Sequence, residues 1–143
     1  MGWREWVALP GLGVAAINAK IDTGAGVSAL HASNLEVSGE EGREVATFEI
    51  QIKQRSATPV VAVQADVDCY LRVRSSSGQS ERRPVVTTAV RVGEETWDIE
   101  LTLTRRDEMG YRMLLGRQAV RKRFVVDPGH SYLFGRPPKE DRP

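Results

Sequence analysis

The stretch "AKIDTGAGVSALHA" (residues 19–32) contains the features that decide the predicted fold. It begins as an apolar strand that ends at Ile21, and the next residue is the carboxylate Asp22. Thr23, Gly24 and further small residues then permit a tight loop into a second strand, "SALHA". A glycine in this loop lets another backbone approach closely, because a Cβ would block the contact. The segment predicts a strand–loop–strand unit with Asp22 on the floor of a cleft; a simple turn between two strands is the alternative.

Alternation of apolar and polar residues predicts strands over most of the chain. The segments 47–53 ("TFEIQIK") and 96–104 ("TWDIELTLT") alternate strictly, which puts Thr102 and Thr104 on a polar face. Residues 83–92 lead into the second segment across a turn that begins at Gly93. The fold class is therefore all-β.

The last third of the sequence contains the predicted exceptions and the end of the domain. Residues 116–124 ("GRQAVRKRF") offer one short helix, and 124–127 ("FVVD") and 131–134 ("SYLF") indicate short closing strands. We expect one domain over 1–136 and a flexible, proline-rich tail over 137–143.

Composition excludes several classes of protein. The chain has 143 residues and a formal net charge of +1, so no global field favours nucleic acid or a membrane surface. It contains no apolar run long enough to span a bilayer. The single cysteine, Cys69, cannot form an internal disulfide. Together with the absence of an N-terminal signal pattern, this predicts a cytoplasmic protein.

The segment "MLLGRQAV" (residues 113–120) follows the Asp-Thr-Gly loop much later in the sequence. In this combination the chain resembles the retroviral-type aspartic peptidases, whose subunits carry one Asp-Thr-Gly-Ala loop, a late apolar pair, a glycine and a short helix. More closely, it is similar to a bacterial family of retropepsin-like peptidases that are often labelled ATP-dependent zinc proteases. The blocks "GWREWVALP", "RPVVTTAVRVGEETWDIELTLTRRDEM" and "KRFVVDPGHSYL" extend this resemblance over about residues 2–134.

The resemblance implies a retropepsin-like fold, a closed or partly closed antiparallel barrel with one short helix. It also implies a homodimeric aspartic endopeptidase without a cofactor, because each subunit would supply one catalytic aspartate. Two carboxylates that meet across a two-fold axis share a proton, and together they act as acid and base on the peptide bond. The implied catalytic loop consists of Asp22, Thr23 and Gly24, and the implied supporting residues are Ala25, Leu114, Leu115 and Gly116.

Ala25 and a serine-rich segment refine this expectation. Alanine cannot donate the hydroxyl hydrogen bond that pepsin-like relatives often supply at this position, which predicts peak activity in mildly acidic to neutral conditions. Retropepsins carry a flap between their two motifs, and here that interval contains a polar hairpin tip. The possible flap, for which a surface loop is the alternative, comprises Ser75, Ser76, Ser77, Gly78, Gln79 and Ser80.

The zinc and ATP in the family label find little support in the residues. Zinc needs three or four clustered ligands, and the candidates are only His31, His130 and Cys69, with no HExxH motif. Asp66 and Asp68 offer at most a weak cation site. The chain also lacks a phosphate-binding loop of the Walker type. We therefore expect no metal.

Paired arginines suggest possible partners. Arg72 with Arg74 and Arg82 with Arg83 would favour acidic substrates if they lie beside the flap, although solvated faces balanced by nearby Glu and Asp are the favoured explanation of such pairs. The family resemblance adds a possible association with ATP-grasp glutamate ligases, and hence with glutamate-rich substrates. Two alternatives to the endopeptidase remain open: a non-catalytic dimeric module that partners such a ligase, and a metal-dependent protease.

Overall fold

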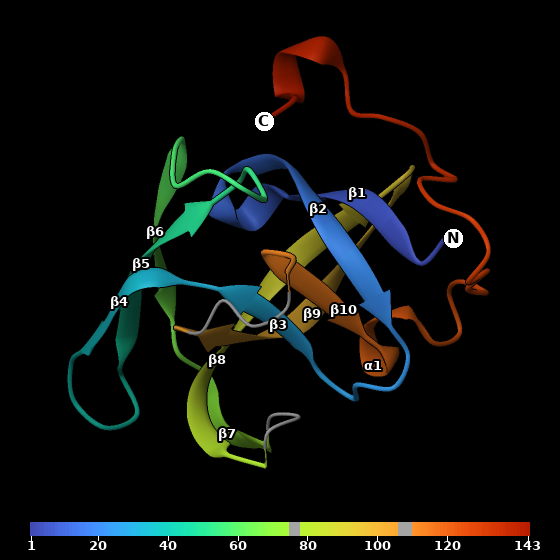
Figure 1. Cartoon of the computed structure of the whole chain (residues 1–143). Helices are drawn as coiled ribbons and strands as arrows, with labels where there is room; N and C mark the ends of the chain where they lie inside the picture. The colour runs from blue at the N-terminus through green and yellow to red at the C-terminus, as the bar shows by residue number, and fades with distance from the viewer. Residues whose placement is uncertain (75–77, 106–109) are drawn as a thin grey trace.

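The computed structural model describes residues 1–74, 78–105 and 110–143. Strands dominate these ranges, which confirms the all-β class (Figure 1). The strands are β1 (Arg4–Leu9), β2 (Val14–Asp22), β3 (Ser28–His31), β4 (Ser33–Ser38), β5 (Val45–Gln51), β6 (Val60–Asp66), β7 (Cys69–Arg74), β8 (Ser80–Val92), β9 (Glu95–Thr104) and β10 (Met113–Gly116). The helices are the single-turn α1 (Arg117–Val120) and the 3-10 turns η1 (Pro10–Leu12) and η2 (Lys139–Asp141). None of the helices in the described ranges is long and apolar enough to cross a membrane.

Seven strands form the main sheet, in the order β1-β2-β10-β3-β9-β8-β7. An additional pairing of Ala8 in β1 with Arg91 in β8 connects two distant strands and makes the sheet a ring. Most pairings are antiparallel, as expected, but β10–β2 and β3–β9 are parallel. These parallel pairings occur because β10 and β9 return beside the strands that enter and leave the Asp22 loop.

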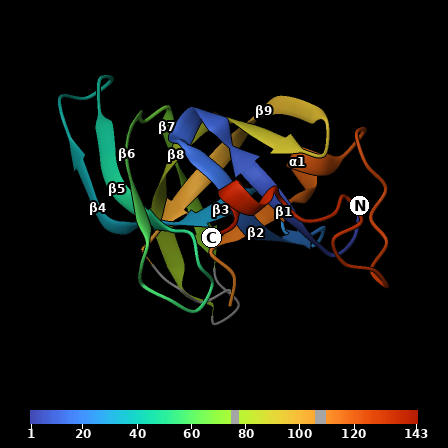
Figure 2. The ribbon, with the colours of Figure 1, turned by 90° about the horizontal axis from the view of Figure 1, so that it is seen from above.

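The remaining strands form a smaller sheet in the order β4-β5-β6. Both ribbon views place it at the end of the molecule away from α1 (Figures 1 and 2). The alternation predicted for residues 47–53 is confirmed in β5, where Phe48 and Ile50 are buried and Thr47 is exposed. These apolar side chains join the core of the main sheet, so the two sheets share one core.

The prediction that β9 has a polar face is wrong at the C-terminal end of the strand. Thr102 and Thr104 are buried, although the alternation put them opposite the apolar face. This part of β9 pairs with β3 inside the sheet, and the Thr104 hydroxyl donates to Glu81 Oε2 over 3.1 Å. The Thr102 hydroxyl donates to the carbonyl oxygen of Ser28 over 2.8 Å, which satisfies it inside the protein.

The chain after α1 wraps around the ring instead of adding strands to it (Figure 1). The predicted strands at 124–127 and 131–134 are wrong: this region contributes only an isolated bridge between Asp127 and Gly2. Its backbone bonds with the first residues of the chain, as when Trp3 N–H donates to the carbonyl of His130 over 2.9 Å. A left-handed residue, Tyr132 with φ of 54°, then turns the segment away from an extended path.

Candidate active site

Asp22 is the last residue of β2 and lies on the less buried face of that strand. The alternate residues Ile17, Ala19 and Ile21 are buried in the core, whereas Asp22 is half-buried. The backbone N–H of Gly24 donates to Asp22 Oδ1 over 3.0 Å and so orients the carboxylate. Among the described residues no other donor reaches this carboxylate, which leaves acceptor sites for further partners.

The loop after Asp22 is bound to the start of α1. The N–H of Arg117 donates to the carbonyl of Ala25 over 2.8 Å, and the N–H of Gln118 donates to that of Gly26 over 3.1 Å. The guanidinium of Arg117 also donates, to the carbonyl oxygens of Thr23 at 3.1 Å and Gly24 at 3.4 Å. These bonds fix the loop backbone without using the Asp22 side chain.

Gly116 lets the two segments cross. A Cβ added there would lie 2.5 Å from the carbonyl oxygen of Val27, closer than any real contact. Leu115, fully buried, pairs with Ile21 beneath the loop, and Leu114 is half-buried beside Lys20. The close approach that the sequence suggested at Gly24 thus occurs at Gly116 within one chain.

Thr23 and Gly24 project from the loop and are exposed. A Cβ at Gly24 would meet only Asp22 Oδ1, at 3.2 Å, so one chain alone leaves this side of the loop open. Beside Thr23 lies a shallow depression of about 360 Å³, whose lining includes Val120, Phe124 and Val126. The exposed side of the loop therefore continues into an apolar surface.

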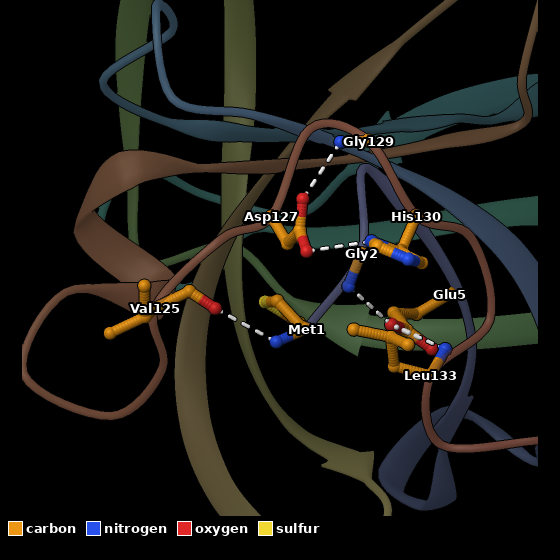
Figure 3. Close-up of polar contacts among 8 residues, drawn as sticks. All are labelled: Met1, Gly2, Glu5, Val125, Asp127, Gly129, His130 and Leu133. Atoms are coloured by element: carbon orange, nitrogen blue, oxygen red, sulfur yellow. Dashed lines mark hydrogen bonds and ion pairs between the residues drawn. The ribbon is translucent and has the colours of Figure 1, made fainter.

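Sequence reasoning missed a second carboxylate, Glu5, which is completely buried. It accepts backbone N–H groups from Gly2 at 2.7 Å and Leu133 at 3.1 Å (Figure 3). It also accepts the N–H of Phe134 at 3.3 Å. The carboxylate joins β1 to the wrapping C-terminal segment. No sequence signal pointed to it, because a glutamate in an alternating strand normally indicates a solvent-facing position. The role of Arg117, in contrast, could have been sought directly after the Leu-Leu-Gly motif.

Asp127 and His130 form an exposed pair in the same wrapping segment (Figure 3). Asp127 accepts the N–H of Gly129 over 2.9 Å, and its other oxygen lies 2.7 Å from His130 Nδ1. The Gly129 hydrogen bond, and secondarily the His130 bond, lower the pKa of Asp127 below its ordinary value.

The residues that the zinc label would require do not fit a metal site. His31 lies in β3 with its ring 3.3 Å from Arg112, His130 pairs with Asp127, and Cys69 is exposed on β7. Asp68 accepts a hydrogen bond from Thr87. The described part of the chain contains no group of three or more histidine, cysteine or acidic side chains able to hold an ion.

The hairpin β7–β8 contains the predicted flap only in part. Residues 75–77 of the predicted flap lie outside the described residues, Gly78 and Gln79 precede β8, and Ser80 begins it. Arg72 lies directly opposite Arg82, whose guanidinium stacks 3.7 Å above the Tyr70 ring. The arginine at 83 differs, because it pairs with Glu81 over 2.9 Å.

The strand ring and the Asp22 loop, which is bound to the start of α1, place this chain in the retropepsin-like class. The sequence profile of the RimB-like family, described as retropepsin-like aspartic endopeptidase RimB, matches residues 1–137, and the chain belongs to that family. The crystal structure of Lpg0085 from Legionella pneumophila, a protein of unknown function, has the same fold. It superposes with a TM-score of 0.76 and 25% identity, over 93% of this chain and 95% of that one.

Curated relatives are longer proteins, and their name is that of a ligase rather than an endopeptidase. A probable alpha-L-glutamate ligase of Shewanella pealeana is 42% identical over 135 residues, which cover 94% of this chain and 30% of the relative. A protein of the same name from Parasynechococcus marenigrum is 44% identical, over 94% of this chain and 29% of its own length. The chain therefore spans about 30% of the length of the curated relatives that it matches.

Proposed function

We propose that the chain is an aspartic endopeptidase in which Asp22 of two identical subunits forms the catalytic dyad. The observation that carries this proposal is the state of Asp22: its loop is fixed by Arg117 and Gly116, yet its carboxylate is half-buried and bonded only to Gly24 among the described residues. Each chain has a single Asp-Thr-Gly sequence, so a second copy must supply the other carboxylate.

A second subunit would meet the open side of the loop. Thr23 and Gly24 are exposed there and adjoin the apolar depression near Val120 and Phe124. Covering such a surface stabilises association because apolar area leaves water. Contact between two Gly24 residues, which lack a Cβ, would let the Asp22 side chains approach each other.

The proposed chemistry needs only water and the two carboxylates. The ionised carboxylate takes a proton from water, whose oxygen attacks the carbonyl carbon, while the protonated carboxylate donates to the carbonyl oxygen. Collapse of the tetrahedral intermediate breaks the C–N bond, and the proton held by the first carboxylate passes to the leaving nitrogen. The shared proton keeps the two negative charges from opposing each other.

The substrate we propose is an acidic, glutamate-rich peptide. Relatives that contain a region similar to this chain are named probable alpha-L-glutamate ligases, which supports a substrate or partner that carries added glutamates. The exposed arginines 72, 74 and 82 supply positive charge on β7–β8. The same names favour a second candidate function, a non-catalytic module that docks onto a glutamate ligase.

The test is hydrolysis of unstructured acidic peptides between pH 4 and 8 by the wild type and Asp22→Asn, each with and without EDTA. We expect Asp22→Asn to lose about 10³-fold in rate, since both acid and base steps need the dyad, and EDTA to have no effect. Asp66→Asn, an exposed carboxylate on β6, is the matched control. Inhibition by EDTA would favour a metal-dependent protease. A wild type that binds a ligase but cleaves nothing would favour the docking module.

A further inference from the structure

The sheet face that carries Asp22 continues along β2 away from the loop. Alternate residues of a strand point to the same side, so Lys20 and Asn18 share the side of Asp22. Their burial agrees, because all three are half-buried, whereas Ala19 and Ile21 between them are buried in the core. The residue two positions before the catalytic carboxylate is therefore a lysine that reaches the same surface.

Neighbouring strands extend this surface on both sides of Lys20. The register places Lys20 opposite Arg4 of β1 and opposite Leu114 of β10, and residues paired across a sheet point to the same side. We call this surface the Asp22 face. It consists of Arg4, Asn18, Lys20, Asp22 and Leu114.

Two cations thus lie directly opposite each other on the Asp22 face. Like charges in this position destabilise an antiparallel strand pair. Among the described residues no carboxylate forms an ion pair with Lys20 or Arg4. An anion supplied by another molecule would relieve the repulsion between Lys20 and Arg4.

The two cations differ in how firmly they are held. The guanidinium of Arg4 donates to Ser131 Oγ at 3.1 Å and Tyr111 Oη at 3.3 Å, and lies 4.6 Å from the Trp3 ring centre and 4.8 Å from that of Tyr132. The hydrogen bond to Tyr111 is the main cause that raises the pKa of Arg4, and an arginine carries its charge at any pH of interest. The Lys20 backbone pairs in the sheet, but its side chain makes no hydrogen bond within the described residues, so the ammonium is free to bond a ligand.

We propose that Lys20, supported by the fixed charge of Arg4, binds a carboxylate side chain of the substrate beside the peptide bond that Asp22 hydrolyses. This inference rests on the proposed function, because it takes Asp22 as the reacting group. Two residues along a strand span about 6.6 Å, which is also the repeat of side chains on one side of an extended peptide. A peptide bond held at Asp22 therefore brings a nearby substrate side chain to Lys20.

The chemistry of the Asp22 face suits glutamate in particular. The Lys20 ammonium donates to the carboxylate, and the half-buried Leu114 offers an apolar surface for the methylene groups of the same side chain. Arg4 adds positive potential without moving, because its contacts to Ser131 and Tyr111 hold it in place. A glutamine would fit the same space but would lack the charge that both cations attract.

The test compares hydrolysis of hexa-L-glutamate and hexa-L-glutamine by the wild type, Lys20→Met and Lys20→Arg. We expect Lys20→Met to lower the ratio of kcat/KM for hexa-L-glutamate to kcat/KM for hexa-L-glutamine about tenfold. Only the value for hexa-L-glutamate should fall. Lys20→Arg should keep most of the wild-type ratio. Lys139→Met, the same change in η2 of the C-terminal segment, is the matched control and keeps the wild-type ratio. If Lys20→Met keeps that ratio, or lowers both values equally, the inference is wrong.

A binding measurement separates this inference from the proposed function. Hexa-L-glutamate is titrated into Asp22→Asn with and without Lys20→Met, so that no hydrolysis is needed. We expect about tenfold weaker binding without Lys20, and no change for hexa-L-glutamine. If the wild type hydrolyses neither peptide but this difference appears, the proposed function fails and the subsite stands. Equal affinities, or no binding of hexa-L-glutamate, would overturn the subsite even if peptides are cleaved.

Discussion

Asp22 and Glu5 are both carboxylates held by backbone N–H groups, but they differ in how completely they are satisfied. Glu5 is fully buried and accepts three N–H groups, whereas Asp22 is half-buried and accepts one within the described chain. A carboxylate has about four acceptor sites, so Glu5 has little capacity left and Asp22 has most of it. The comparison indicates that Glu5 stabilises the fold, while Asp22 keeps the free acceptor sites that the proposed dyad requires.

The largest expected effect on stability is that of Glu5→Ala. This change leaves the N–H groups of Gly2, Leu133 and Phe134 without their acceptor and detaches the C-terminal segment from β1. Each buried donor left without a partner costs about 1–3 kcal/mol, so we expect the free energy of unfolding to fall by about 3 kcal/mol or more. Urea unfolding at pH 7 measures this change.

Asp22→Asn is the contrasting variant in the same experiment. Its free energy of unfolding should stay within about 0.5 kcal/mol of the wild type, because an amide oxygen can still accept the Gly24 N–H. If Asp22→Asn destabilises the chain as much as Glu5→Ala, Asp22 is a structural carboxylate and the comparison fails. Glu5→Gln should fall between the two, since it keeps the shape but loses the charge.

A smaller effect is expected for Gly116→Ala, which changes the support of Asp22 without touching the carboxylate. The added Cβ would lie 2.5 Å from the carbonyl oxygen of Val27, so the loop must move. Overpacking of this kind costs about 1–3 kcal/mol, and the shift of the loop should also lower the hydrolysis rate. Unfolding and peptide cleavage are measured on the same sample.

Gly129→Ala is the matched control for Gly116→Ala. Its added Cβ would lie 3.3 Å from the Asp127 carboxylate, which is exposed and able to adjust. We expect little change in either stability or cleavage. A Gly116→Ala protein with unaltered stability and rate would show that the crossing of β10 with the loop does not position Asp22.

The sequence predicted the parts of this fold that depend on local pattern. The alternation of β5, the turn at Gly93, the short helix after Gly116 and the strand before the Asp22 loop are confirmed, although β2 includes Asp22 itself. These features depend on neighbouring residues alone, because period-two alternation and a left-handed glycine act locally.

Long-range contacts account for what the sequence did not predict. Thr102 and Thr104 read as solvent-facing, but both are buried, and their hydroxyls bond to residues far away in the sequence. Residues 124–127 and 131–134 read as strands, yet their partners are Gly2, Arg4 and Glu5 rather than a neighbouring ladder. Glu5 itself looks ordinary in sequence, because its three donors come from both ends of the chain.

Asp127 has two hydrogen-bond partners, which is more than Asp22 and fewer than Glu5. The effect on stability that we expect from its substitution is the smallest of this series. It is exposed, accepts the Gly129 N–H and pairs with His130. These bonds lower the pKa of Asp127 in the folded state. A depressed folded pKa contributes stability that is complete above the ordinary value of about 3.9 and is lost as the pH falls through the folded value.

Asp127→Asn tests this reasoning through the pH dependence of thermal unfolding. The variant should have a lower Tm than the wild type at pH 5, and the gap should close between pH 4 and pH 2, because the wild type loses an ionised group that the variant never had. Asp66→Asn controls for the loss of one exposed carboxylate. A gap that stays constant down to pH 2 would mean that ionisation of Asp127 does not hold the turn against the N-terminal residues. Glu5 would then be the carboxylate that attaches the C-terminal segment to the N-terminal residues. The contrast between a structural Glu5 and an available Asp22 would become clearer.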